Sequence, residues 1–452
     1  MNAICQESGM RGASVGFCAI ALESGEVVAS YEAGRLLIPA SVMKAVTTAT
    51  ALETLGAGYR FKTEIQYVGS LENGVLRGDV VVKGGGDPTL GSSNISSTYA
   101  RWTQKLKEAG IRSIEGRIVG DASAFGTQLR PDSWQWNDLG NYYASGATGL
   151  NFHENLFYCS FQTGATGTLA KLVGTDPRLP EIRFANEMRG GPSGSGDNGY
   201  VFGSPYATTL YLRGTLPPYR SYTIKGALPD PAFFCVRGWT KYLRGQGVPV
   251  SGEPTTVRRL VADQGGISSQ RTTLYQQQSD DLASILVLTN HKSNNLRAEA
   301  IHRVMALEKK GLGSTGAAEV MVREMWANRG VDMTGFLMED GCGLSRANAC
   351  SAKQLAHILA KMSKTESFSA FERSLPVAGR SGTLASIGGG SAAEGRVRAK
   401  SGTLDRVKNY AGYVSARSGK RYAFALMINQ ELCTTSTLKA KIVRVWNRMV
   451  AL

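Results

Sequence analysis

The chain has 452 residues, 42% of them hydrophobic and 19% charged, so it can bury a substantial core and is not a disordered protein. Its 51 basic and 36 acidic residues give a formal net charge of +15, which favours an anionic partner such as nucleic acid, anionic lipid or an acidic wall polymer without choosing among them. Seven cysteines without a Cys-x-x-Cys pair, and only four histidines, exclude a disulfide scaffold and the common metal-ligand spacings.

The first predicted elements are two strands and a helix. Apolar residues alternate through residues 14–32, and a Glu-Ser-Gly-Glu turn divides that stretch into two strands. Pro39-Ala40-Ser41 then opens a helix, because apolar residues from Val42 to Leu52 recur at helical spacing. Gly56 follows the last turn and is placed to end the helix.

The middle of the chain has a different pattern from its ends. Between residue 63 and about residue 261, short β-like runs alternate with Gly, Pro, Asn and Asp clusters, and residues 190–199 predict a long loop. Helical spacing returns from about residue 280, and three antiparallel strands and a final amphipathic helix follow at 396–401, 409–415, 422–429 and 434–452. The pattern predicts an α+β domain formed by both ends and a β-rich insertion between them.

The sequence leaves the cellular compartment open. The longest apolar run, at residues 15–22, is far shorter than the ~20 residues of a membrane span. The first residues show neither the basic nor the apolar part of a secretory signal, so the protein is either cytoplasmic or a mature chain whose signal was removed.

Ser41-Val42-Met43-Lys44 is an S-x-x-K motif at the start of a predicted helix. Side chains three residues apart share one helical face, so the lysine amine can approach the serine hydroxyl and remove its proton. The helix N-terminus adds free N–H groups suited to an oxyanion. The alternative is that Ser41 caps the helix and Lys44 is solvated; a second copy at 436–439 shows that one match does not decide.

Ser293-Asn294-Asn295 is an S-x-N motif between two predicted helical segments. A hydroxyl and a carboxamide two residues apart in a loop can both face one cleft, where the hydroxyl relays protons and the carboxamide binds an amide. The alternative is that Ser293 caps the helix that follows.

Lys400-Ser401-Gly402-Thr403 lies on a predicted strand. A lysine beside a hydroxyl can bind a substrate carboxylate, and glycine lets a substrate backbone approach closely. The alternative is a basic edge strand that resists aggregation, and a second copy, Arg380-Ser381-Gly382-Thr383, shares the pattern.

The three motifs occur in the order of the S-x-x-K, S-D-N and K-T-G set of penicillin-binding proteins and β-lactamases. The chain resembles the class C low-molecular-mass penicillin-binding proteins, which are D-alanyl-D-alanine carboxypeptidase/endopeptidases of the penicillin-binding protein 4 type (peptidase family S13). The resemblance covers nearly the whole chain. It rests on segments 38–44, 83–90, 120–125, 134–136, 293–299, 340–346, 375–384 and 400–404.

The resemblance implies an α+β fold, in which a β-rich two-domain insertion interrupts a penicillin-binding, serine β-lactamase-like catalytic domain with a central antiparallel sheet flanked by helices. The catalytic domain is expected at 1–62 and 262–452, one insert domain at 63–90 and 165–261, and a second, nested in the first, at 91–164. It also implies export, hence a periplasmic or other extracytoplasmic location, where a basic chain suits anionic envelope polymers.

The implied activity is that of a serine DD-peptidase, a serine-type D-Ala-D-Ala carboxypeptidase. It would cleave D-Ala-D-Ala termini or peptide cross-links of peptidoglycan through an acyl-enzyme, without cofactor or metal. Its expected partners are peptidoglycan stem peptides and inhibitory β-lactams, with no nucleic acid and no membrane span; a homo-oligomer is left open. The alternatives are another serine hydrolase of the same fold (β-lactamase, esterase or D-aminopeptidase) and a non-catalytic binder of anionic envelope polymer.

The resemblance also implies residue roles, and it indicates which copy of each repeated motif belongs to the active site. Arg380 precedes the active-site strand and Ser436 follows all three motifs, so neither belongs to the set. Cys342 stands where serine is usual, and a buried inert thiol is favoured over a reactive one. The implied roles are Ser41 as nucleophile, Lys44 as its base, Ser293 and Asn295 as proton relay and amide contact, Lys400, Ser401, Gly402 and Thr403 as the substrate-binding strand, and the backbone N–H groups of Ser41 and Thr403 as the oxyanion hole.

Overall fold

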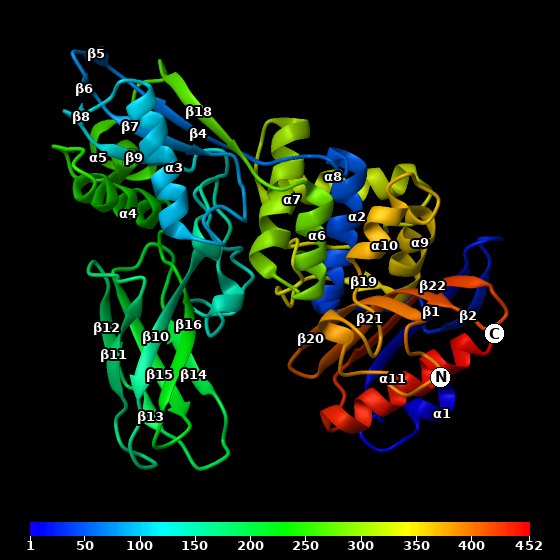
Figure 1. Ribbon diagram of the computed structural model, residues 1–452. Helices are drawn as coiled ribbons and strands as arrows, with labels where there is room; N and C mark the ends of the chain where they lie inside the picture. Colours follow the sequence, from blue (N-terminus) through cyan, green and yellow to red (C-terminus); the bar gives the residue numbers. More distant parts are fainter. The chain divides into compact units, whose positions relative to one another are not determined.

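The computed structural model describes residues 1–452, apart from the side chain of Gln264, and divides them into two compact units (Figure 1). Unit 1 consists of Met1–Arg60 and Asp280–Leu452, and unit 2 of Phe61–Ser279. Both ends of the chain therefore build unit 1, and one continuous segment builds unit 2.

Unit 1 is organised around a five-stranded antiparallel sheet. Its strands, from edge to edge, are β2 (Val27–Tyr31), β1 (Ser14–Ala21), β22 (Arg421–Asn429), β21 (Val407–Ser415) and β20 (Val397–Leu404). The first strand of the chain thus pairs with the last, with Val15 opposite Ile428. Strand β22 is buried along almost its whole length, so its sequence is almost continuously apolar rather than alternating.

Helices cover both faces of this sheet (Figure 1). On one face α11 (Thr435–Val450) buries Trp446, whose ring meets that of Tyr410 edge-on at 5.1 Å. The other face carries the remaining longer helices of the unit. They are α2 (Met43–Leu55), α6 (Leu282–His291), α7 (Asn295–Lys310), α8 (Thr315–Asn328), α9 (Ala352–Met362) and α10 (Phe368–Ser374). Short elements complete the unit: α1 (Asn2–Cys5), β3 (Leu36–Leu37), β19 (Cys350–Ser351), and the 3₁₀ turns η1 (Ala40–Val42) and η4 (Gly382–Leu384).

Helix α2 lies at the centre of this helical layer and is buried from Met43 to Leu52. A helix that is covered all round cannot leave its polar side chains to water. Its threonines therefore bond backward along the helix: Thr48 Oγ1 donates to the Lys44 carbonyl at 2.6 Å, and Thr50 Oγ1 to the Val46 carbonyl at 2.8 Å. The same burial removes Lys44 from water.

Unit 2 contains a mixed five-stranded sheet and two smaller β layers. The mixed sheet runs β17 (Thr255–Thr256), β9 (Ile118–Asp121), β7 (Val80–Gly84), β4 (Lys62–Tyr67) and β18 (Thr272–Gln278). Its helices are α3 (Ile95–Glu108), α4 (Pro231–Gly245) and α5 (Val257–Gln264). The smaller layers are a sheet of β11 (Lys171–Asp176), β10 (Leu156–Gln162) and β16 (Ser221–Ala227), and one of β12 (Arg183–Asn186), β15 (Thr209–Leu216), β13 (Arg189–Gly190) and β14 (Asn198–Phe202). The short β5 (Ser70–Glu72), β6 (Val75–Arg77) and β8 (Ser113–Ile114) form a further ribbon, and η2 (Tyr142–Ala144) and η3 (His153–Asn155) are 3₁₀ turns.

Strand β18 moves the boundary between the units away from the expected position. It pairs antiparallel with β4, so residues 262–279 belong to unit 2 and the chain returns to unit 1 at Asp280 rather than at residue 262. The strand reads Thr-Thr-Leu-Tyr-Gln-Gln-Gln and lacks the apolar alternation that predicts a strand. The division of the insertion into two nested domains stays a prediction.

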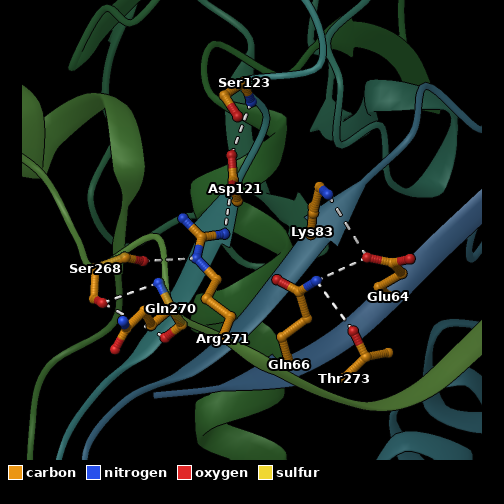
Figure 2. Close-up of polar contacts among 9 residues, drawn as sticks. All are labelled: Glu64, Gln66, Lys83, Asp121, Ser123, Ser268, Gln270, Arg271 and Thr273. Carbon is orange, nitrogen blue, oxygen red and sulfur yellow. Dashed lines mark hydrogen bonds and ion pairs between the residues drawn. The ribbon is translucent and has the colours of Figure 1, made fainter. Parts of the chain in front are cut away.

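Side-chain bonds also fasten this segment to its sheet (Figure 2). Arg271 Nη1 donates to Asp121 Oδ2 at 2.5 Å, at the end of β9, and Gln66 Nε2 on β4 donates to Thr273 Oγ1 at 3.3 Å. Burial alone would raise the pKa of Asp121, but hydrogen bonds from Ser123 and Arg271 outweigh it and lower that pKa below its usual value. Both links hold β18 within unit 2.

Among the residues that the structure describes, no helix is both long enough and apolar enough to cross a membrane.

Candidate active site

Ser41 and Lys44 lie where η1 passes into α2. Lys44 is completely buried, and its Nζ lies 2.9 Å from Ser41 Oγ, 2.5 Å from Asn295 Oδ1 and 2.6 Å from the Cys342 carbonyl oxygen. Burial lowers the pKa of Lys44, and the nearby groups of Cys342, Asp340 and Glu299 oppose that shift. A lysine whose pKa is lowered in this way has more of the neutral amine that can act as a base.

The backbone before Ser41 is held in place by the sheet and by a glycine. Asn409 on β21 donates through Nδ2 to the carbonyl oxygens of Ile38 at 2.8 Å and Pro39 at 2.7 Å. Gly343 packs so tightly against the turn that a Cβ at this position would lie 1.9 Å from the Ala40 carbonyl oxygen. Only glycine allows the loop after Gly341 to approach the serine this closely.

The S-x-N segment faces the same site, with separate roles for its serine and its asparagines. Asn294, not Ser293, caps α7, since its side chain accepts from the Arg297 N–H at 3.0 Å. Ser293 has a φ of +53° and its Oγ accepts from Lys400 Nζ at 2.9 Å. The interpretation of Ser293 as a helix cap is therefore wrong. Asn295, the third residue of the motif, contacts Lys44 as described above.

Lys400 lies on β20 beside Ser41. It is completely buried, and its Nζ donates to Ser293 Oγ and, at 2.8 Å, to the Ser401 carbonyl. Burial lowers its pKa well below the usual value, and the charges of Lys44 and Lys408 add to the shift. A Cβ on Gly402 would lie 2.7 Å from the Pro39 carbonyl oxygen and 3.1 Å from the Ser41 nitrogen, so glycine lets this strand pass next to the serine.

The structure thus brings Ser41, Lys44 and Asn295 into one hydrogen-bonded group and Ser293 and Lys400 into a second. Thr403 is exposed and its Oγ1 accepts from Lys408 Nζ at 2.7 Å. The oxyanion hole formed by the Ser41 and Thr403 N–H groups stays a prediction.

Neither of the second copies builds a comparable group. Ser436 Oγ contacts Thr434 Oγ1 at 3.1 Å, while Lys439 Nζ donates to Ser386 Oγ at 3.0 Å, so this serine and lysine have separate partners. The exposed Arg380 pairs with Glu394 at 3.6 Å.

Sequence reasoning assigned no role to three groups that the structure places at the site. The Cys342 carbonyl is a main-chain atom, which no side-chain pattern can reveal. Thr383 Oγ1 accepts from Ser401 Oγ at 2.7 Å, although its segment was recognised only as a neighbour of the active-site strand. Asn409 sits inside an apolar strand, where a buried polar residue was the available signal.

Cys342 has a buried thiol, as expected. Burial raises its pKa well above the usual value, and Asp340 and Glu299 add to that effect, so the thiol stays protonated and is a poor nucleophile. Its position beside Lys44 is used through its carbonyl, not through its sulfur.

We expect iodoacetamide at about pH 8 to leave Cys342 unmodified in the folded protein while it alkylates the partly exposed Cys5. Both cysteines should react after unfolding in guanidinium. Mass spectrometry of the two cysteine-containing peptides measures this, and equal rates in the folded protein would show that the Cys342 thiol is accessible.

Glu299, Asp340 and Cys342 form a buried cluster whose potential ligand atoms lie within 4.8 Å of one another. Most of these atoms hold the loop backbone: Asp340 accepts from the N–H groups of Gly343 and Ser345, each at 2.6 Å, and Glu299 Oε1 accepts from the Cys342 N–H at 2.7 Å, while Glu299 Oε2 has no hydrogen-bond partner. The Cys342 thiol is protonated, whereas a metal ligand would have to be the thiolate.

The family model of the D-Ala-D-Ala carboxypeptidase 3 (S13) family matches residues 1–449. The chain belongs to this family. Among relatives of this S13 chain, a D-alanyl-D-alanine carboxypeptidase of Actinomadura sp. (strain R39) is 30% identical over 446 residues, which cover 95% of this chain and 80% of that protein. D-alanyl-D-alanine carboxypeptidase DacB of Haemophilus influenzae is 27% identical over 435 residues, covering 92% and 86%.

The crystal structure of penicillin binding protein 4 from Haemophilus influenzae matches the S13 chain with a TM-score of 0.85 at 23% identity, covering 100% of this chain and 99% of that one. A structure of that protein complexed with a β-lactam matches with a TM-score of 0.79 at 22% identity. This likeness confirms the predicted fold class, and the family match confirms the resemblance. The predicted enzyme class, a serine-type D-Ala-D-Ala carboxypeptidase, is confirmed by family membership and by the relatives.

Proposed function

We propose that this S13 chain cleaves the D-Ala-D-Ala terminus or a peptide cross-link of peptidoglycan through an ester on Ser41. The observation that carries the proposal is the buried Lys44 amine, 2.9 Å from Ser41 Oγ. Ser41 Oγ attacks the carbonyl carbon of the scissile bond while its proton passes to Lys44. The terminal D-residue leaves after its nitrogen gains a proton, and water then hydrolyses the ester and frees Ser41.

Hydrogen-bond geometry supports Lys44 as the base in this scheme. A neutral lysine amine has two N–H bonds and one lone pair. If Asn295 Oδ1 and the Cys342 carbonyl accept the two N–H bonds, the lone pair is left for the third neighbour, Ser41 Oγ. These two acceptors therefore orient the base as well as bind it.

Ser293 and Lys400 are proposed to complete the cycle. Ser293 lies on the route by which a proton can reach the leaving nitrogen, because its Oγ is bonded to Lys400. Lys400 is buried, and its Nζ donates to the Ser293 hydroxyl and the Ser401 carbonyl. Both of these acceptors are neutral groups. A substrate carboxylate beside Nζ would oppose the lowering of the Lys400 pKa and favour the charged ammonium form.

The site is proposed to work outside the cytoplasm. Peptidoglycan lies there, and the formal net charge of +15 suits a surrounding of anionic envelope polymers.

Amidating the terminal carboxylate of an acyl-D-Ala-D-Ala peptide is expected to lower kcat/KM at least tenfold in the wild type. Hydrogen bonds to charged groups contribute ~1.5–3 kcal/mol, and this one would be lost. In Lys400→Ala the remaining activity should be low and nearly the same for acid and amide, because the group that discriminates between them is gone. The measurement is the ratio of kcat/KM for the two peptides.

Arg380→Ala is the matched control, since it changes the cation of the second copy. Its exposed side chain pairs with Glu394, so its acid-to-amide ratio should equal that of the wild type. An unchanged ratio in Lys400→Ala would contradict the proposed carboxylate contact.

A further inference from the structure

Two buried carboxylates hold the peptide groups before and after the Cys342 Cα. The Cys342 N–H donates to Glu299 Oε1 at 2.7 Å, and the Gly343 N–H donates to Asp340 Oδ1 at 2.6 Å. The Gly343 nitrogen and the Cys342 carbonyl belong to one planar peptide group, so fixing the N–H end fixes the direction of the oxygen. That oxygen lies 2.6 Å from Lys44 Nζ.

Helix α7 supplies both the direct and the indirect contact to Lys44. Asn295 and Glu299 are four residues apart, so they lie on one face of the helix. Asn295 binds Lys44 itself, and Glu299 binds the residue whose carbonyl binds Lys44. The helix and the loop are in close contact here, because a Cβ on Gly341 would lie 2.5 Å from the Cβ of His302.

We propose that Glu299 is a positioning residue: it fixes Cys342 so that its carbonyl accepts one Lys44 N–H and the lysine lone pair faces Ser41 Oγ. This inference rests on the proposed role of Lys44 as base. Glu299 touches neither Ser41 nor the substrate in this scheme and acts only through the loop.

The required property of Glu299 is a hydrogen-bond acceptor at the correct reach, rather than a negative charge. Burial raises its pKa to about 7, Asp340 adds to the shift and Arg303 opposes it, so near neutral pH the carboxyl is partly uncharged. His302, on the same helix, is kept neutral because burial lowers its pKa to about 3. The carbonyl oxygen of a protonated carboxyl, or of an amide, still accepts an N–H.

Two substitutions separate reach from charge. Glu299→Gln keeps the length and an acceptor oxygen but removes the charge, whereas Glu299→Asp keeps the charge and loses one methylene of reach. We expect the acylation rate constant with penicillin to stay within about threefold of wild type in Glu299→Gln and to fall at least tenfold in Glu299→Asp, since a displacement of about 1 Å at a catalytic group can cost about 10²-fold. The dissociation constant of the initial complex should be unchanged in both, because Glu299 does not bind the ligand.

The time course of adduct formation, followed by intact mass at several penicillin concentrations, yields both constants. Glu308→Gln and Glu308→Asp are the matched controls, since Glu308 is on the same helix but exposed, with its Oε1 accepting from Tyr59, and should match wild type. If Glu299→Asp does not fold, Glu299→Met replaces it, because it retains length without an acceptor.

A fall in Glu299→Gln as large as in Glu299→Asp would overturn the proposal, as would normal acylation by a folded Glu299→Asp. An equal rise in the dissociation constant would also overturn it, because the defect would then lie in ligand binding. The failure of the wild type to form an adduct at Ser41 is a different outcome, which would refute the proposed function itself.

Discussion

Replacing Ser41 by alanine is expected to abolish covalent labelling by penicillin. In the wild type, the β-lactam ring should open onto Ser41 Oγ and add a single adduct, because the Lys44 amine lies 2.9 Å away to take the proton. Without the hydroxyl no ester can form, whatever the rest of the site retains. Intact-mass measurement of both proteins, with peptide mapping of the wild-type adduct, tests this.

The matched control is Ser436→Ala, which alters the serine of the second S-x-x-K copy. Its neighbour Lys439 donates to Ser386 instead, so this variant should label like the wild type. An adduct on the Ser436 peptide would show that the wrong copy has been chosen. The lifetime of the Ser41 adduct is also informative, because rapid hydrolysis would favour the β-lactamase alternative over a peptidase.

Lys44→Ala is expected to slow acylation by about 10²–10⁴-fold, the range for loss of a general base. The substitution removes the only amine near Ser41 Oγ among the contacts that the structure describes, and it also leaves Asn295 Oδ1 and the Cys342 carbonyl without their common donor. The rate constant for acylation by penicillin, measured at saturating concentration, reports the chemical step. Residual slow labelling at Ser41 is compatible with this prediction, because the nucleophile remains.

Lys439→Ala should leave that rate constant unchanged, since Lys439 lies on α11, is only partly buried and donates its hydrogen bond to Ser386. If acylation were equally slow in both lysine variants, the result would contradict the role of Lys44 as base. The slow acylation would then reflect a loss of protein stability common to both substitutions. Thermal unfolding of both variants would then show a matching loss.

The sequence predicted the elements of unit 1 well because their signals are local. The strand alternation around Phe17, the helical spacing from Val42 and the final three strands each appear within a short window, and all have counterparts in the structure. The three motifs could be found for the same reason, because each places its reactive side chains within a few residues. That the three motifs lie in one site was predicted from the family resemblance, because no pattern in the sequence indicates it.

Other features depend on contacts that no local pattern encodes. Strand β18 is polar and is recognisable only beside its partner β4, which is why the boundary was expected too early. The acceptor that Cys342 offers to Lys44 is main chain, and the loop that carries it is bonded to Glu299 on α7, 43 residues away in the sequence. Thr383 reaches Ser401 only because a 3₁₀ turn lies beside β20.

The pairing of β1 with β22 has a consequence for how the protein is made. During synthesis the segment with Ser41 emerges first, but the neighbour of its strand in the sheet ends at Asn429, and Lys400 also comes late. Unit 2 has all its strand partners between residues 61 and 279 and can be completed while the N-terminal segment waits. The nascent chain therefore carries Ser41 without the late strands of this sheet until residues 397–429 have been made, so the proposed site cannot form before that point.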